Sequence, residues 1–192
     1  DCHSGRHRGR GRSTTEDRMP ADKTREKSPH EAEPDTEQSI PLVGAPAPDF
    51  TLHNERNEPV HLADLRGKQV VLYFYPKDDT PGCTVEACSF RDAWHDMQAE
   101  GIVVLGISRD SVKSHQKFAN KYGLPFTLLA DEGGKVAQQY GSWVEKHMYG
   151  RTYMSTARTT FYIRPDGRVG HVWERVKPEG HAQKVLEFVK KN

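Results

Sequence analysis

The chain has 192 residues, with 28 Lys and Arg against 27 Asp and Glu, and a formal net charge of +1 at pH 7. This length is enough for one domain with a full hydrophobic core. A nearly neutral chain has no overall electrostatic attraction to nucleic acid or to an anionic membrane surface, so we expect neither as a partner. Three cysteines are too few for a disulfide framework and suit either a cytosolic protein or thiols that do chemistry.

Targeting signals are not evident in this sequence. No apolar run approaches the roughly 18 residues of a membrane-spanning helix. No positively charged segment followed by an apolar core stands at the N-terminus, so we expect no intact signal peptide and a cytoplasmic protein. Because the sequence begins with Asp1 rather than Met, a processed or exported form stays open.

Residues 1–38 contain no Val, Leu, Ile, Phe, Tyr or Trp. Such a segment cannot bury enough apolar surface to offset the entropy of ordering it, so we expect a disordered tail followed by one domain over residues 39–192. Arginines alternate with Gly and His over residues 6–12, which would suit an arm for an anionic partner. A solubilising tail is the simpler interpretation. Cys2 lies in this tail, and we assign it no role.

Globular composition begins near residue 40. Short extended runs bounded by turn residues predict strands over residues 50–53, 59–61, 70–75, 102–107, 126–129, 159–163 and 169–173. Periodic apolar residues predict helices or helical turns over residues 62–65, 112–122, 135–140 and 181–190, and one long helix from about Cys83 to Gly101. Residues 142–156 have weak periodicity and are predicted to form a long loop.

The order of these elements predicts an α/β fold. Strands alternate with helices and are followed by a hairpin whose turn carries Asp166 and Gly167, which indicates a mixed sheet with helices on both faces. The strand over residues 102–107 is apolar throughout, as expected in a sheet covered on both sides. The sequence contains no internal repeat.

Cys83 stands where a strand, a polar turn and a helix follow one another. Asp78, Asp79 and Thr80 can cap free helix amides, and Pro81 suits a first helical turn. Unpaired N–H groups and the macrodipole at a helix N-terminus favour a thiolate. The placement suits a reactive thiol, although a buried structural cysteine is an equally common case.

A second cysteine, Cys88, follows five positions later. On an α-helix this spacing separates the side chains by roughly 140° and by a rise of about 7.5 Å. A disulfide needs Cα atoms within about 7 Å and converging Cβ atoms, so the pair cannot close while the helix is intact. That is a poor arrangement for a structural staple, but it suits a redox cycle with a conformational step. Neither C-x4-C nor the ten histidines match a metal-binding spacing, so we expect no metal and no cofactor.

The eight residues from Pro76 to Cys83, PKDDTPGC, match the P-x-x-x-T-x-x-C motif of the peroxiredoxins. The following residues, TVEACSFRD, resemble the branch called bacterioferritin comigratory protein or peroxiredoxin Q. The resemblance runs from about Val43 to the C-terminus and includes RTTF, which begins at Arg158. It implies a thioredoxin-like fold with an N-terminal β extension. It also implies a thiol-dependent peroxidase that reduces hydrogen peroxide and organic hydroperoxides.

The resemblance implies roles for five residues. Cys83 would be the peroxidatic nucleophile that becomes a sulfenic acid. Thr80 would orient the peroxide, Pro76 would shield the oxidised sulfur, and the fixed charge of Arg158 would support the thiolate. Cys88 would be the resolving cysteine, giving a Cys83–Cys88 disulfide that thioredoxin or a similar dithiol reduces. A monomer or weak dimer is implied.

Other residues of the motif region receive weaker assignments. For Glu86, a hydrogen bond to Arg158 or to the backbone and simple solvation of the helix are equally good interpretations. His115 is predicted to pack on a helix face. The three tryptophans are predicted to pack in the core or line a pocket rather than hold a cofactor: Trp94, Trp143 and Trp173.

Two other functions stay open. A thioredoxin-type disulfide oxidoreductase would share the fold, but C-x4-C replaces C-x-x-C, and Arg158 stands where a thioredoxin has proline. A redox-sensing or binding module would use the same two cysteines. Only turnover with excess peroxide separates that module from an enzyme.

Overall fold

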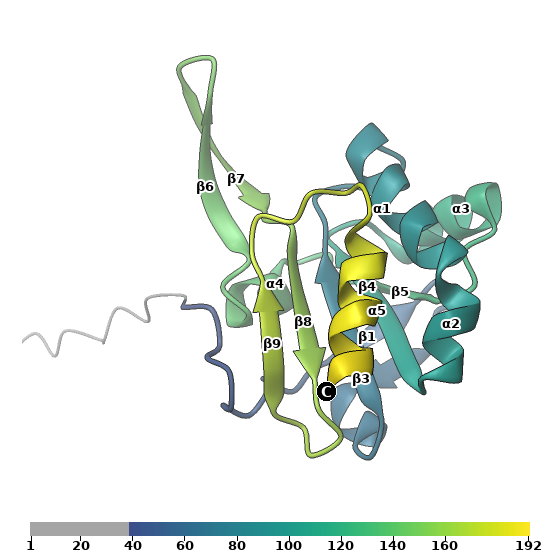
Figure 1. Ribbon diagram of the computed structural model, residues 1–192. Coiled ribbons are helices and arrows are strands. Elements are labelled where there is room, and N and C mark those ends of the chain that lie inside the picture. Colours follow the sequence, from purple (N-terminus) through teal and green to yellow (C-terminus); the bar gives the residue numbers. More distant parts are fainter. Residues whose placement is uncertain (1–38) are drawn as a thin grey trace, which may run out of the picture. The chain divides into compact units, whose positions relative to one another are not determined.

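A computed structural model describes residues 39–192; the tail predicted over residues 1–38 lies outside the described residues. The described residues form a seven-stranded mixed sheet, in the order β2-β1-β5-β4-β3-β8-β9, and a separate two-stranded ribbon, β6-β7 (Figure 1). The strands are β1 (Thr51–Asn54), β2 (Pro59–His61), β3 (Gln69–Phe74), β4 (Ile102–Ser108), β5 (Thr127–Ala130), β6 (Trp143–Met148), β7 (Arg151–Thr156), β8 (Thr159–Ile163) and β9 (Val169–Trp173). The helices are α1 (Pro81–Asp92), α2 (Trp94–Ala99), α3 (Val112–Tyr122), α4 (Lys135–Gln139) and α5 (His181–Lys191), with one 3-10 turn, η1 (Leu62–Leu65).

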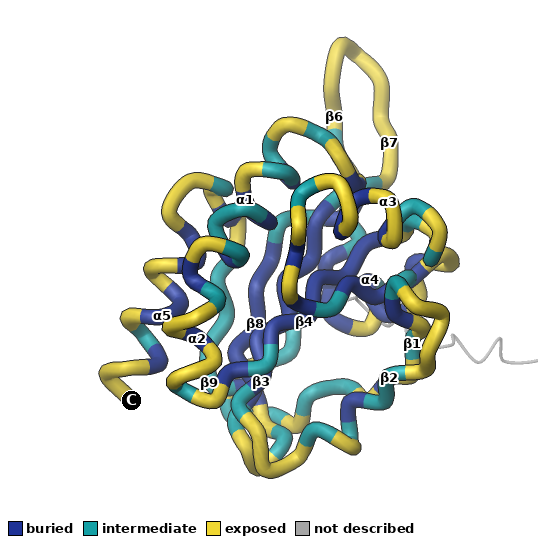
Figure 2. The backbone as a smooth tube through the Cα atoms, turned by 90° about the vertical axis from the view of Figure 1, so that its right-hand side faces the viewer, coloured by how far each residue is buried: buried dark blue, intermediate teal, exposed yellow. Residues whose placement is uncertain are grey.

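Strand β3 lies at the centre of the sheet and serves both cores. It pairs in parallel with β4 and antiparallel with β8. Because successive side chains of a strand point to opposite faces, Val71 and Tyr73 enter one core while Leu72 and Phe74 enter the other. Helices α1, α2, α3 and α5 contribute side chains to the first core. Helix α4 and the residues between 40 and 65 contribute side chains to the second. Figure 2 shows the central strands buried along their length.

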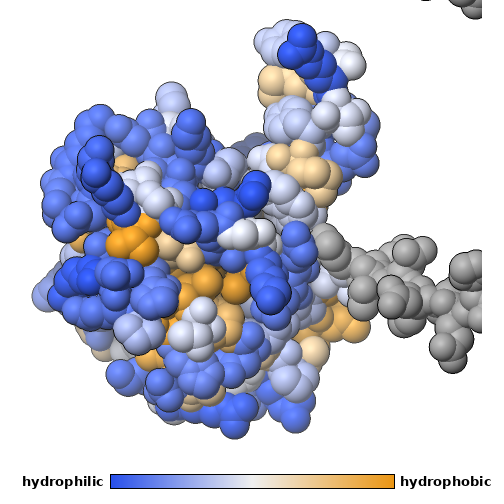
Figure 3. Space-filling model, turned by 180° about the vertical axis from the view of Figure 1, so that it is seen from behind, coloured by the Kyte–Doolittle hydropathy of each residue, from blue (hydrophilic) through white to orange (hydrophobic). Residues whose placement is uncertain are grey.

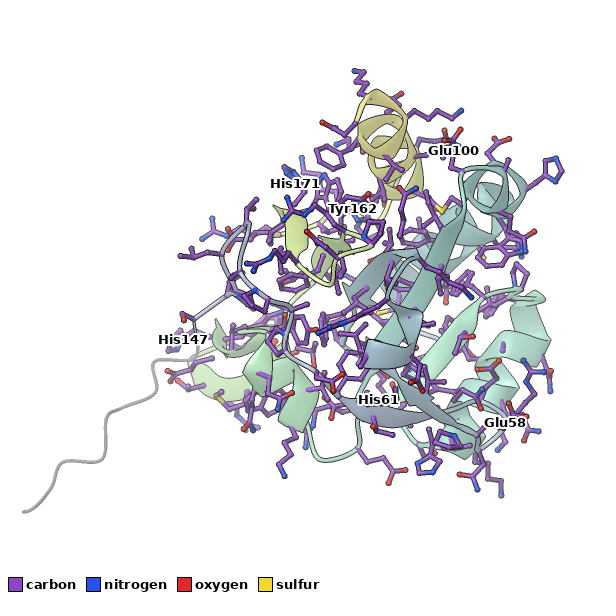
Figure 4. The ribbon with its side chains drawn as sticks, turned by 90° about the horizontal axis from the view of Figure 1, so that it is seen from below. Glu58, His61, Glu100, His147, Tyr162 and His171 are labelled. Atoms are coloured by element: carbon purple, nitrogen blue, oxygen red, sulfur yellow. The ribbon has the colours of Figure 1, made fainter. Side chains whose placement is uncertain are left out.

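The first core continues beneath α5 at the edge of the sheet. Tyr162 on β8 and His171 on β9 point toward this helix (Figure 4). The His171 ring stacks on the Phe188 ring with their centroids 4.5 Å apart, and the Tyr162 ring packs edge-on against Phe188 with a centroid distance of 5.7 Å. The tryptophans predicted to pack do so: Trp94 and Trp173 lie against the first core and Trp143 against the second. Within residues 39–192 no helix is long and apolar enough to cross a membrane.

The predicted strands are confirmed, each with ends that differ by no more than one residue. The single long helix predicted after Cys83 is wrong, because Ala93, with φ −89° and ψ 0°, separates α1 from α2. The apolar stripe of Phe90, Trp94 and Met97 continues across this break and stays in or against the core. Periodicity alone therefore could not reveal the break.

The loop predicted over residues 142–156 is also wrong, since these residues contain the β6-β7 hairpin. Tyr149 and Gly150 form its two-residue turn, with φ of 52° and 71°. Two positive φ values are typical of a type I′ hairpin turn, but tyrosine is an unusual residue there. Both strands are largely exposed, so no alternation of buried and exposed residues marks them in the sequence.

Gly106 on β4 allows close packing at the centre of the first core. It lies opposite Tyr73, and an added Cβ would come within 2.7 Å of the Tyr73 hydroxyl oxygen and 2.9 Å of Leu128 Cδ2. The Tyr73 ring is held in turn by stacking on Phe90 at 4.7 Å. The site therefore has no space for a methyl group.

We expect Gly106→Ala to lower the free energy of unfolding by about 1–3 kcal/mol, because the added methyl group overpacks the core. Urea unfolding followed by fluorescence measures this change. Gly133→Ala is the matched control, since a Cβ added there would have no atom within 4 Å and the φ of Gly133 is not positive. Equal stability of the two variants would contradict the packing account.

Candidate active site

Cys83 is the third residue of α1 and is 1% exposed. Pro81 begins the helix, as predicted, because its fixed φ suits the first turn and its missing N–H would have no helical partner. The backbone carbonyl of Thr80 accepts from the N–H of Thr84 at 2.8 Å. The sulfur therefore lies at the end of the helix where the dipole is positive.

Arg158 contacts Cys83 although 75 positions separate the two residues in the chain. The antiparallel register of β3 and β8 pairs Phe74 with Thr159, which brings the residue before β8 to the end of β3 where the motif begins. Arg158 Nη2 donates to Cys83 Sγ at 3.2 Å. The fold thus brings together two side chains, those of Cys83 and Arg158, that lie far apart in the sequence.

Gly82 permits this approach. A Cβ at this position would lie 2.6 Å from Arg158 Nη2 and 3.3 Å from its Cζ. The guanidinium therefore lies directly against the backbone of the first helical turn, where a larger residue would displace it. The same added Cβ would lie 3.5 Å from Pro178, so the loop before α5 closes the other side.

Glu86 holds the other end of the guanidinium. Arg158 Nη1 donates to Glu86 Oε2 at 3.1 Å, which decides between the interpretations of Glu86 left open by the sequence. The Glu86 side chain is fully buried, and burial raises the pKa of its carboxyl to about 7 although the Arg158 charge acts in the opposite direction. Its Oε1 has no hydrogen-bond partner among the described residues. The ion pair is therefore incompletely solvated by the protein.

The remaining predicted site residues make no side-chain hydrogen bond to Cys83 within the described part of the chain. The Thr80 hydroxyl donates to the Lys77 carbonyl at 2.9 Å, which orients its oxygen without using its lone pairs. Pro76 is half-buried and follows β3 directly. Cys88 is also half-buried, and both cysteines are free thiols on an unbroken α1.

The buried side chain of Asp78 anchors the loop between β3 and α1. Its carboxyl accepts from the hydroxyl groups of Tyr75 at 2.5 Å and Ser114 at 2.9 Å, and contacts His115 Nδ1 at 2.6 Å. His115 Nε2 faces the Leu129 carbonyl at 2.9 Å. A carbonyl only accepts, so Nε2 is the donor to Leu129, while Nδ1 faces the Asp78 carboxyl. His115 is therefore more than the packing residue predicted from its helical position.

Asp79 fixes the outer side of the same loop. Its carboxyl oxygens accept from Lys121 Nζ and the Tyr122 hydroxyl, both at 2.8 Å, and these hydrogen bonds lower its pKa, the one from Lys121 most. The side-chain capping of α1 expected from Asp78, Asp79 and Thr80 is not found, because Thr80 occupies the cap position without a side-chain hydrogen bond. Both aspartates instead form hydrogen bonds with side chains of α3, and Asp78 also accepts from Tyr75. No local pattern in the sequence indicates partners in α3, which lies more than 30 positions away.

No group of three or more His, Cys, Asp or Glu side chains within residues 39–192 could hold a metal ion. The chemistry of the site as described rests on one buried sulfur, one guanidinium and the donors of a helix N-terminus. These groups suit a thiolate that attacks a small electrophile and a leaving oxygen that gains negative charge.

A sequence profile of the AhpC/TSA family matches residues 43–172. A peroxiredoxin bcp of Coxiella burnetii is 54% identical over 144 residues, covering 75% of this chain and 95% of that protein. Peroxiredoxin Bcp of Bacillus subtilis is 43% identical over 148 residues, covering 77% of this chain and 94% of that protein.

Solved structures agree with these sequence comparisons. Peroxiredoxin Q of Xanthomonas campestris superposes with a TM-score of 0.74 at 35% identity, covering 81% of this chain and 98% of that one. A cysteine-to-serine mutant of PrxQ from Xylella fastidiosa gives a TM-score of 0.76 at 34% identity, covering 80% of this chain and 98% of that one. The thioredoxin-like fold expected from the motif is thereby confirmed. The chain belongs to the AhpC/TSA family, as a peroxiredoxin of the Bcp or peroxiredoxin Q branch.

Proposed function

We propose that this thiol-dependent peroxidase uses Cys83 as its peroxidatic cysteine and Cys88 as its resolving cysteine. The observation that carries the proposal is the Arg158 guanidinium, which bonds at once to Cys83 Sγ and to the buried carboxylate of Glu86. A fixed cation beside a sulfur at a helix N-terminus stabilises the thiolate form, which is the nucleophile.

In the first step, the Cys83 thiolate attacks one oxygen of the hydroperoxide. A sulfur–oxygen bond forms, the oxygen–oxygen bond breaks, and the sulfur is oxidised to sulfenic acid while the peroxide is reduced. The leaving alkoxide or hydroxide takes up a proton and departs as alcohol or water. Arg158 is placed to stabilise its negative charge, and the Gly82 and Cys83 amides are further donors near the sulfur. The Thr80 hydroxyl, whose proton goes to the Lys77 carbonyl, would accept a hydrogen bond from the peroxide and so orient it. Pro76 shields the sulfenic acid.

In the second step, the Cys88 thiolate attacks the Cys83 sulfur. The new sulfur–sulfur bond displaces the sulfenic oxygen, which leaves as water after protonation. Because the cysteines lie five positions apart on a helix, which keeps their side chains from meeting, residues 84–89 must unwind first. This motion breaks the hydrogen bond from the Ala182 N–H to the Ser89 hydroxyl, 3.3 Å long, which joins α1 to α5.

A dithiol protein of the thioredoxin type then reduces the disulfide by exchange. Organic hydroperoxides are proposed substrates beside hydrogen peroxide, since one structure of the Xanthomonas campestris bacterioferritin comigratory protein concerns its alkyl peroxide reduction activity. A thioredoxin-type reductant requires a reducing compartment, for which the cytoplasm is the expected case. We assign this chemistry to residues 39–192.

The test is peroxide consumption coupled to thioredoxin, thioredoxin reductase and NADPH. We expect Cys83→Ser to abolish turnover and Cys88→Ser to consume about one equivalent of peroxide before it stalls, because its sulfenic acid has no internal partner. Cys2→Ser is the control and should turn over like the unaltered chain. A fully active Cys88→Ser variant under these conditions would refute the resolving role.

Removing the guanidinium should slow the first step without preventing the second. We expect Arg158→Met to reduce the rate constant for Cys83 oxidation by about 10²–10³-fold, a loss typical of one charge-stabilising donor. Stopped-flow fluorescence with hydrogen peroxide measures this rate. Arg56→Met, which removes an exposed arginine far from α1 in the chain, is the control. A similar loss in both variants would point to a general charge effect instead.

Glu86 should make stability depend on pH. Its folded-state pKa of about 7 lies above the ordinary carboxyl value of 4.5, so its stabilising contribution is complete below about pH 4.5 and is lost as pH rises through 7. The pKa difference corresponds to about 3 kcal/mol at most. Urea unfolding between pH 4.5 and 8 should show this fall in the unaltered chain and a flatter profile in Glu86→Gln. Parallel profiles would show that Glu86 is not the group responsible.

A further inference from the structure

The β6-β7 hairpin exposes large apolar side chains away from the seven-stranded sheet. It stands away from the seven-stranded sheet in Figure 1, and apolar patches alternate with polar ones along it in Figure 3. Four large apolar side chains are exposed on it: Met148 at 53%, Tyr149 at 95%, Tyr153 at 41% and Met154 at 47%. A lone two-stranded ribbon is marginally stable in water, so a hairpin of this composition gains by being covered.

The two edges of this ribbon differ in chemistry. Strand β6 carries the charged Glu145 and Lys146, followed by the polar His147, and charged side chains discourage edge pairing. His147 is labelled in Figure 4. Strand β7 has no charge after Arg151, since its remaining residues are TYMST. Among residues 39–192, β7 pairs with β6 alone, so its other edge presents free backbone groups. An uncharged open edge is a template for a further strand.

We propose that two copies of this chain associate by antiparallel pairing of β7 with β7 of the second copy, centred on Tyr153. In a two-fold arrangement Tyr153 faces its own counterpart, Thr152 faces Met154, and Arg151 faces Ser155. Aromatic pairs stabilise such ladders, and no charged side chain lies opposite a like charge. The edge is therefore complementary to itself, which favours a second copy over an unrelated peptide.

The same register gives the exposed turn a place to bind. Four residues before Tyr153, the turn residue Tyr149 comes opposite Ala157 of the second copy. Ala157 lines a cleft of about 610 Å³ at the base of the hairpin, together with Val144, Val176 and Arg158. Val176 is tied to this position by its N–H, which donates to the Arg158 carbonyl at 3.0 Å. Each tyrosine would thus cover the cleft beside Arg158 of the other copy.

Cross-linking tests the register directly. In a chain with Cys2, Cys83 and Cys88 replaced by Ser, we expect Tyr153→Cys to form a disulfide-linked dimer under mild oxidation, because the two Cα atoms lie about 5 Å apart across the two-fold axis. His147→Cys is the control, since two β6 strands in a four-stranded sheet lie roughly 14 Å apart. Equal cross-linking at both positions, or none at either, would overturn the proposal.

Sedimentation of the unaltered chain over a range of concentrations gives an independent readout. We expect a reversible monomer–dimer equilibrium whose dissociation constant rises about tenfold in Met154→Lys, because a lysine on an edge strand opposes pairing. The new lysine would face Glu145 across the hairpin, so the hairpin itself should persist. His147→Lys, on the other edge, should leave the equilibrium unchanged. A monomer at every concentration, or a dimer indifferent to Met154→Lys, would refute the arrangement. Peroxidase turnover, measured separately, decides the role of Cys83 in either case.

Discussion

The rest of this site depends on one interaction, the contact of the Arg158 guanidinium with Cys83 and Glu86. The guanidinium joins a sulfur and a carboxylate that lie one helical turn apart on α1, and it approaches them from the position just before β8. Three features make that approach possible: the register of β3 with β8, the missing side chain at Gly82, and the buried position of Glu86. An arginine is suited to this position because its planar fork bonds two acceptors at once and keeps its charge.

The proposed chemistry places opposing demands on α1. The helix must hold Cys83 against Arg158 for the first step, yet residues 84–89 must unwind for the second. The loop before α1 resolves this conflict, because Asp78 and Asp79 bind α3 and neighbouring groups rather than α1 itself. Under the proposed mechanism, unwinding of residues 84–89 would leave these contacts of Asp78 and Asp79 in place. Glu86 contributes as well, since a buried carboxyl with one unpartnered oxygen limits the stability of the segment that has to open.

The hairpin β6-β7 belongs to neither core, and its exposure follows from that. Its strands gain stability from each other and from contacts at their base, where Trp143 packs against the second core and Arg109 lies over its ring at 4.3 Å. The chain leaves β7 only two residues before Arg158 begins the approach to β8. The base of the hairpin therefore lies close to the residue that contacts Cys83.

The sequence by itself determined the local structure: the apolar strand β3, the stop at Pro76, the start of α1 at Pro81 and the place of Cys83 in its first turn. These features depend on neighbouring residues, whose propensities and periods are visible in a short window. Arg158 was identified through a resemblance, since no local pattern connects it with Cys83. Tertiary structure decided the rest: the partners of Asp78 and Glu86, the break at Ala93 and the exposed hairpin. Each of these features depends on the register of strands distant in the chain or on burial. Register and burial cannot be predicted from the spacing of adjacent residues.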